Sequence, residues 1–137
     1  TKERGGAMRP YNAKASHFLG VKTPIVVLVD GYSASAAEII TGALKDKKLA
    51  TVVGEPTFGK ASVQVLVDLK NGGALVITTA KYLTPLKHDI SDKGITPDVL
   101  IKASAEDEKS GRGAQLQKAV DVLRNRNNAA LVAAKAD

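Results

Sequence analysis

The side chains best suited to catalysis lie in two short segments of this 137-residue sequence. The segment GYSASAAE, at residues 31–38, offers two serine hydroxyls, those of Ser33 and Ser35. The segment GEPTFGKAS, at residues 54–62, offers the amine of Lys60. A serine hydroxyl becomes a nucleophile when a neighbouring base removes its proton, and a neutral lysine amine is one such base. The two segments together are therefore suited to nucleophilic attack on a carbonyl group.

The second segment also fits the phosphate-binding pattern G-x-x-x-x-G-K, with Gly54, Gly59 and Lys60 in place. A loop of that kind needs a Ser or Thr hydroxyl next, to hold Mg²⁺, and a following helix whose amides face the phosphates. Here the next residue is Ala61, and the residues after it alternate in the way a strand does. The nucleotide interpretation is therefore disfavoured, and we expect no nucleotide, cofactor or metal.

The serines have alternative interpretations. A Ser-His-Asp triad would need His17 or His88, and neither lies in a recognisable motif. Ser33 or Ser35 would cap the free amides of a helix, which stabilises a helix by about 1 kcal/mol. The spacing S-x-x-E from Ser35 to Glu38 fits such a capping box. The same amides would also stabilise an oxyanion formed when a serine attacks a carbonyl.

Lys60 has a simpler interpretation as a solvated side chain in a turn. To act as a base near pH 7, a lysine needs its pKa lowered by about three units, which costs roughly 4 kcal/mol of charge stabilisation. Burial in an apolar pocket has that effect. Phe58 and the valine-rich segments on either side would give Lys60 a dry setting of this kind.

An α/β pattern positions these residues. Residues 24–30, PIVVLVD, form an apolar β-branched run that is typical of a strand buried on both faces. Apolar residues recur at helical spacing from Ala36 to Leu44, and residues 49–54 form a second short strand. Strand, helix and strand within about 30 residues predict a βαβ unit with a right-handed crossover.

The remaining elements are shorter or less regular. Residues 62–69 and 74–83 alternate as strands around the turn residues 71–73, which predicts an antiparallel hairpin. A short final strand is expected at 99–101, and an amphipathic helix from residue 114 onward. We therefore expect a lead-in at 1–20, a core at 21–101, and a linker with a helix at 102–137.

Composition excludes several classes of function. There is no Cys, which rules out disulfides, Cys-based zinc sites and a Cys nucleophile. The net charge is +6, but the basic residues are scattered and aromatic residues make up only 4% of the chain. A nucleic-acid binder would need a basic stripe with aromatic stacking platforms, so we expect no nucleic-acid partner. No apolar run approaches the roughly 20 residues that a membrane span needs.

Together the segments resemble the carboxy-terminal processing proteases, also called tail-specific proteases, of the S41 serine peptidases. The matching segments are PIVVLVDGYSASAAEIITGAL, VVGEPTFGKASVQ and GITPDV. They occur in the family's order and spacing over about residues 22–101, with weaker agreement in AQLQKAVDVL. The resemblance implies a βαβ-containing mixed sheet with flanking helices, as a partial core of the ClpP/crotonase type.

The same resemblance implies a Ser-Lys dyad. Its nucleophile, the second serine of S-A-S-A, falls on Ser35, and its general base, the lysine of F-G-K, falls on Lys60, 25 residues later. A glutamine four residues after the lysine orients it in the family, and that position is Gln64. One oxyanion amide is implied to be that of Ala36. Ser33 stays open as the competing nucleophile.

Some features depart from the family pattern. Ala61 stands where the family often has Gly, and Gly5-Gly6 lacks the apolar strand that should precede the motif supplying the other oxyanion amide. The family's upstream PDZ domain has no counterpart in this sequence. We therefore expect the C-terminal part of a protease domain, inactive when isolated. The alternative is a non-catalytic binding or scaffold module of the same fold.

The resemblance also implies partners and a location. The substrates would be proteins or peptides with apolar C-terminal tails, with an upstream PDZ domain in the parent chain. The location would be extracytoplasmic, in a periplasm or cell envelope. Apolar surface left exposed by missing strands would favour a homo-oligomer.

Overall fold

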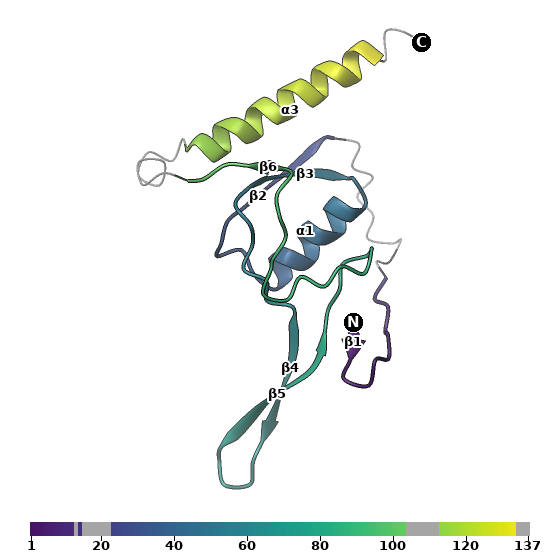
Figure 1. Ribbon diagram of the computed structural model, residues 1–137, viewed down its shortest axis with the longest axis vertical. Helices are drawn as coiled ribbons and strands as arrows, with labels where there is room; N and C mark the ends of the chain where they lie inside the picture. The colour runs from purple at the N-terminus through teal and green to yellow at the C-terminus, as the bar shows by residue number, and fades with distance from the viewer. Residues whose placement is uncertain (13, 15–22, 104–112, 134–137) are drawn as a thin grey trace.

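The computed structural model describes residues 1–12, 14, 23–103 and 113–133, and it has an α/β fold (Figure 1). His17, one of the two histidines considered for a triad, lies outside the described residues. Within the described residues two three-stranded sheets form, with the orders β2-β3-β6 and β1-β5-β4. The elements are β1 Lys2–Glu3, β2 Ile25–Val29, α1 Ala36–Asp46, β3 Ala50–Gly54, β4 Ser62–Asp68, β5 Ala74–Lys81, β6 Val99–Leu100 and α3 Ala114–Ala133.

The first sheet contains the predicted βαβ unit. β2 and β3 are parallel, with Ile25 opposite Ala50 and Val29 opposite Gly54, and β6 adds a third parallel strand. Because β2 is an edge strand, it is only half-buried, whereas Val52 of the central strand β3 is fully buried. The expectation that residues 24–30 are buried on both faces is therefore wrong for β2 and describes β3 better.

Helices cover this sheet. α1 packs against β3, and α3 packs against β2 and β3. In Figure 1, α3 lies above the strands and α1 below them. No described helix combines the length and the apolar character that crossing a membrane requires.

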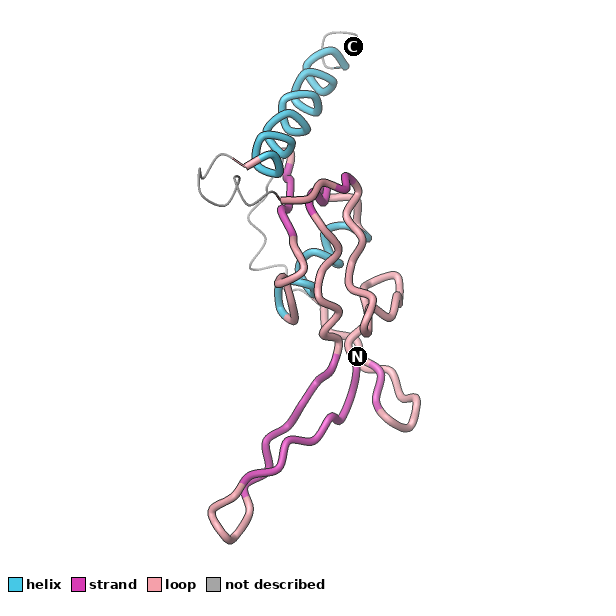
Figure 2. The backbone as a smooth tube through the Cα atoms, turned by 60° about the vertical axis from the view of Figure 1, so that its left-hand side comes forward, coloured by secondary structure: helices cyan, strands magenta, loops and turns pink. Residues whose placement is uncertain are grey.

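The second sheet is the predicted hairpin, joined at its edge by β1. β4 and β5 are antiparallel, and the register shifts between Val63 and Gln64, which marks an irregularity of the bulge type. The hairpin projects away from the rest of the molecule (Figure 1; Figure 2). Its base packs on a small core of Ala61, Tyr82, Ile90 and Ile95. The α/β class is confirmed, with parallel and antiparallel strands in separate sheets.

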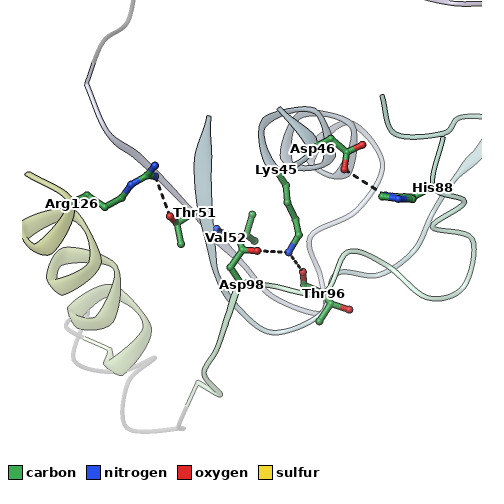
Figure 3. Close-up of polar contacts among 8 residues, drawn as sticks. All are labelled: Lys45, Asp46, Thr51, Val52, His88, Thr96, Asp98 and Arg126. Carbon is green, nitrogen blue, oxygen red and sulfur yellow. Dashed lines mark hydrogen bonds and ion pairs between the residues drawn. The ribbon is translucent and has the colours of Figure 1, made fainter. Parts of the chain in front are cut away.

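Polar contacts fix the GITPDV segment to the first sheet (Figure 3). Lys45 Nζ donates to Asp98 Oδ1 and to the Thr96 carbonyl oxygen, both at 2.7 Å. The Val52 amide donates to Asp98 Oδ2 at 2.8 Å. Burial would raise the pKa of Asp98, but the hydrogen bonds from Lys45 and Val52 outweigh it and hold that pKa below its ordinary value. Asp98 therefore joins α1, β3 and the start of β6.

Candidate active site

Ser33 has a structural role in the turn after β2. Asp30 Oδ1 accepts hydrogen bonds from the Ser33 amide and from Ser33 Oγ, both at 2.8 Å, and from the Tyr32 amide at 3.0 Å. The Asp30 amide in turn donates to Ser33 Oγ at 3.1 Å. A hydroxyl with both a donor and an acceptor already engaged locks the turn. This geometry favours Ser35 over Ser33 as the candidate nucleophile.

Ser35 stands at the N-terminus of α1 in an unusual backbone conformation. Its φ is 56°, in the left-handed region that costs a non-glycine residue roughly 1–2 kcal/mol, and its side chain is exposed. The predicted capping box with Glu38 is present, with the Ser35 amide donating to Glu38 Oε2 at 2.9 Å. Strained residues of this kind cluster at functional sites, where the surrounding structure holds them in place.

The next amide along, that of Ala36, is at the first position of α1. Among the described residues, none accepts a hydrogen bond from the Ala36 N–H. An exposed, unengaged N–H group at a helix N-terminus is suited to binding negative charge. Its position next to Ser35 is the one that the resemblance assigns to an oxyanion donor.

In the loop that carries Lys60, part of the backbone faces inward, whereas the side chains of Lys60 and Phe58 face outward. Thr57 and Ala61 are buried, but Lys60 is exposed and Phe58 is 62% exposed. The expected dry setting for Lys60 is therefore not found in this structure. What faces inward is the backbone, because the amides of Gly59 and Lys60 donate to the buried Glu38 carboxylate at 2.6 and 2.9 Å.

Gly59 allows this loop to lie against the segment that follows β5. Its φ is +90°, and a Cβ atom there would meet the backbone nitrogens of Gly94, Lys93 and Asp92 at 2.8–3.0 Å. The Asp92 amide donates to the Gly59 carbonyl oxygen at 3.0 Å. A glycine is needed here for both the backbone conformation and the close approach.

Glu38 is the centre of the hydrogen-bonding network. Its side chain is fully buried and accepts hydrogen bonds from Thr57 Oγ1 at 2.5 Å and from three backbone amides. Two of those amides, from Ser35 and Lys60, share the single oxygen Oε2, each at 2.9 Å. One carboxylate oxygen therefore joins the backbone of the candidate nucleophile to the backbone of the candidate base.

The network also sets the charge of Glu38. Burial alone would raise the pKa of its carboxyl group. The hydrogen bonds from Thr57, Gly59, Ser35 and Lys60 favour the charged form, outweigh burial, and hold the pKa of Glu38 below its ordinary value of 4.5. Glu38 is therefore a carboxylate at neutral pH.

An open cavity of about 650 Å³ adjoins this network. Its lining includes two exposed aromatic residues, Tyr32 and Phe58, as well as Lys60 and Ala34, the residue before Ser35. The lining residues are Tyr32, Ala34, Phe58, Gly59, Lys60, Ala61, Ser62, Lys81, Ser91 and Asp92. A cavity of this size, lined by both apolar and polar side chains, is suited to part of a peptide.

The side chains of the predicted dyad, both among the described residues, are not hydrogen-bonded to each other in this structure. Within the described part of the chain, no hydrogen bond joins Ser35 Oγ to Lys60 Nζ. Gln64 Nε2 donates to Thr78 Oγ1 of the paired strand at 3.3 Å, and no hydrogen bond joins it to Lys60 among those residues. The structure thus brings together the backbones of Ser35 and Lys60, and it places Gln64 on β4 beyond the register shift.

Sequence reasoning gave Glu38 only a capping role and gave Tyr82 none. The S-x-x-E spacing pointed to the bond with Ser35, but nothing local pointed to the loop at 57–60, which is about 20 positions away. A glutamate on an otherwise apolar helix segment, AAEIITGAL, was the available signal. An acidic residue that would be buried needs several donors.

Comparison with known proteins assigns the class of the chain. The sequence profile of Peptidase family S41 matches residues 1–101. The chain is 40% identical over 126 residues to the carboxyl-terminal-processing protease of Synechocystis sp., covering 90% of this chain and 29% of that protein. It is 44% identical over 101 residues to carboxyl-terminal-processing peptidase 2, chloroplastic, of Arabidopsis thaliana, covering 73% of this chain and 20% of that protein.

Solved structures agree with this class. The photosystem II D1 C-terminal processing protease matches with a TM-score of 0.57 and 47% identity, over 59% of this chain and 21% of that one. The tricorn protease matches with a TM-score of 0.65 over 75% of this chain and 10% of that one, but at 22% identity, which shows the fold alone. The fold and the comparisons place this chain in a family of peptidases.

The chain belongs to peptidase family S41, and its relatives there are carboxyl-terminal-processing proteases. It spans less than a third of the length of the relatives described above.

Proposed function

We propose that this chain carries the Ser35–Lys60 dyad of a serine endopeptidase that cleaves proteins near apolar C-termini. The observation that carries the proposal is the shared oxygen Glu38 Oε2, which accepts the amides of both residues at 2.9 Å. This bond pair ties together two segments that the family pattern assigns to one reaction. The proposal requires the exposed Lys60 side chain to rotate toward Ser35 Oγ, and its flexible four-carbon stem permits such rotation.

The proposed reaction proceeds in two halves. Neutral Lys60 Nζ accepts the Ser35 Oγ proton while Oγ forms a bond to the carbonyl carbon of the scissile peptide. The resulting oxyanion faces the Ala36 N–H. Collapse breaks the C–N bond, the leaving amine takes the proton from Lys60, and an ester to Ser35 is left. Water then gives up a proton to Lys60 and attacks the ester carbon. The bond from that carbon to Ser35 Oγ breaks, Lys60 returns the proton to Oγ, and the acid is released.

Other residues support this reaction. Gln64 would orient the lysine after its side chain leaves Thr78. An extended substrate would be held by main-chain hydrogen bonds, with side chains entering the cavity beside Ala34 and Lys60. The second oxyanion donor and a PDZ domain that selects apolar tails would come from a longer polypeptide, working outside the cytoplasm. Removing one oxyanion donor costs about 10²–10³ in rate, so the 137-residue chain alone would be nearly inactive.

The test uses the complete polypeptide with an unstructured protein as substrate. We expect the wild type to release fragments whose sequences, read by mass spectrometry, place cleavage near apolar C-termini. Ser35→Ala and Lys60→Ala should each abolish cleavage while circular dichroism shows a folded protein. Ser33→Ala is the matched control and should keep cleavage.

Two results would overturn the proposal. Cleavage that survives Ser35→Ala would move the nucleophile elsewhere. Binding of apolar tails without cleavage by the wild type would instead favour a non-catalytic binding module, because the fold and the cavity would then serve recognition alone.

A further inference from the structure

Tyr82 follows β5 directly and packs under the Lys60 loop. Its side chain is 8% exposed and belongs to the small core at the base of the hairpin. Its amide donates to the Ala61 carbonyl oxygen at 2.9 Å. Tyr82 is thus fixed to the residue next to Lys60 before its hydroxyl makes any contact.

The Tyr82 hydroxyl lies among three oxygens from the two candidate catalytic segments. It donates to the Lys60 carbonyl oxygen, and it lies 3.2 Å from the Ser35 carbonyl oxygen and 3.4 Å from Glu38 Oε2. Among the described residues, Tyr82 is the one hydrogen-bond donor to the Lys60 carbonyl oxygen. The Ser35 carbonyl oxygen, by contrast, also accepts the amides of Glu38 and Ile39.

Glu38 and Tyr82 contact different backbone groups of Ser35 and Lys60. Glu38 accepts the amide of Ser35 and the amide of Lys60, whereas the Tyr82 hydroxyl faces the carbonyl oxygens of both. The peptide groups on each side of Ser35 and of Lys60 are therefore held by one buried pair of side chains. Those peptide groups determine where each Cα–Cβ bond points.

We propose that Tyr82 is a positioning residue of the peptidase site, whose hydroxyl holds the backbones of Ser35 and Lys60 in the separation that proton transfer between them needs. The proposal rests on the proposed dyad. Tyr82 lies outside that dyad, directly after β5 and 47 positions beyond Ser35 in the sequence. A change of about 1 Å in the placement of a reacting group lowers a catalytic rate by up to about 100-fold, so the loss of one such contact should be measurable.

The phenol stays neutral over the working range of a lysine base. Burial, together with the negative charge of Glu38 and the hydrogen bond to it, raises the pKa of Tyr82 to about 12. The hydroxyl therefore keeps its proton, and its donation to Lys60, at every pH at which a peptidase of this kind would be assayed.

The experiment measures kcat and KM of the complete polypeptide for cleavage of a peptide with an apolar C-terminus. Tyr82→Phe removes only the hydroxyl, and Tyr11→Phe makes the same chemical change on a side chain that is 76% exposed. We expect Tyr82→Phe to lower kcat about tenfold with KM within twofold of wild type, and Tyr11→Phe to change neither. Assays run well below the midpoint of thermal unfolding separate this loss from a loss of folded protein.

Each outcome of this kinetic experiment either supports or contradicts the proposed role of Tyr82. A folded Tyr82→Phe enzyme with wild-type kcat overturns the positioning role, while inactivity of Ser35→Ala in the same assay leaves the dyad standing. If Ser35→Ala keeps its activity, the dyad fails, and the role of Tyr82 fails with it. A rise in KM at unchanged kcat would also contradict the proposal, since it would show a role in substrate binding.

A second measurement does not need the Tyr82→Phe protein to fold. This measurement uses the 137-residue chain, which has three tyrosines. ¹³C labelling of the tyrosine rings therefore gives three phenol signals in an NMR titration. Tyr11→Phe and Tyr32→Phe, which alter exposed residues, assign two of them. We expect the third to stay neutral at pH 11, and its ionisation near the ordinary value of 10.0 would show that the hydroxyl is not held as proposed.

Discussion

At the scale of single residues, Glu38 joins Ser35 and Lys60, which lie 25 positions apart in the sequence, through hydrogen bonds to both backbone amides. The arrangement holds Ser35 at its positive φ and holds the backbone of the Lys60 loop inward, while the side chains of Lys60 and Phe58 stay exposed. A buried carboxylate depends on its hydrogen-bond donors, since each unpaired buried group costs about 1–3 kcal/mol.

Glu38→Gln is expected to destabilise the protein by about 1–3 kcal/mol at pH 7, because an amide nitrogen cannot accept the bonds that the carboxylate accepts. The difference should depend on pH. The folded pKa of Glu38 lies below 4.5, so its contribution is complete above about pH 4.5 and is lost as the pH falls through the lower folded value. Urea unfolding from pH 7 to pH 3 measures this.

The control for that prediction is Glu55→Gln, which changes a carboxylate near the site that lies outside the network. It should leave stability within about 0.5 kcal/mol of wild type. A constant gap between wild type and Glu38→Gln down to pH 3 would contradict a lowered pKa for Glu38.

Residue-scale prediction from sequence succeeded only in part, for physical reasons. The capping box of Ser35 and Glu38 was predicted because both partners lie within one turn of helix. The hydrogen bonds that Glu38 accepts from the loop at 57–60, and the contacts of the Tyr82 hydroxyl with both segments, depend on tertiary packing that no local pattern encodes. The roles of Ser35, Lys60, Gln64 and Ala36 stay predictions that rest on family resemblance.

At the scale of elements, the sequence was more informative. β-Branched runs, helical spacing and the Asn-Gly-Gly turn predicted the βαβ unit and the hairpin within about two residues of their bounds. The sequence did not reveal the strand order β2-β3-β6, which makes β2 an edge strand. It also did not reveal the register shift beside Gln64. Strand order depends on which edge later segments join, and β6 has only two residues to indicate it.

Asp98 provides a test at this scale. Its bond to the buried Val52 amide should matter more than its ion pair with Lys45, because both charged side chains of that pair are more than 30% exposed. We expect Asp98→Ala to cost about 1–3 kcal/mol and Lys45→Met less than about 1 kcal/mol, measured by urea unfolding. An equal or larger loss for Lys45→Met would show that the ion pair dominates.

At the scale of the whole molecule, the hairpin is the least covered part. Leu66 and Val76 are paired across its strands and are 63% and 57% exposed. Contiguous apolar surface of this kind usually packs against another surface. Sequence alone predicted exposed apolar surface only from the resemblance, because both strands read as ordinary half-buried strands.

We expect the isolated chain to self-associate through the hairpin at tens of micromolar or above. Leu66→Thr with Val76→Thr puts a strand-favouring β-branched residue at both positions and removes apolar surface, so it should shift the sedimentation coefficient toward that of a monomer. Leu86→Thr, at an exposed residue outside the strands, is the control. A chain that is already monomeric, or association that the paired change leaves intact, would contradict this prediction.

The most direct test of the central claim identifies which serine oxygen acts as the nucleophile. The complete polypeptide would be treated with a serine-reactive phosphonofluoridate at the pH of its highest activity, digested, and mapped by tandem mass spectrometry. We predict a single modified site at Ser35, lost in Lys60→Ala and unchanged in Ser33→Ala. Modification at Ser33, or labelling of Ser35 that does not depend on Lys60, would contradict a Ser35–Lys60 dyad.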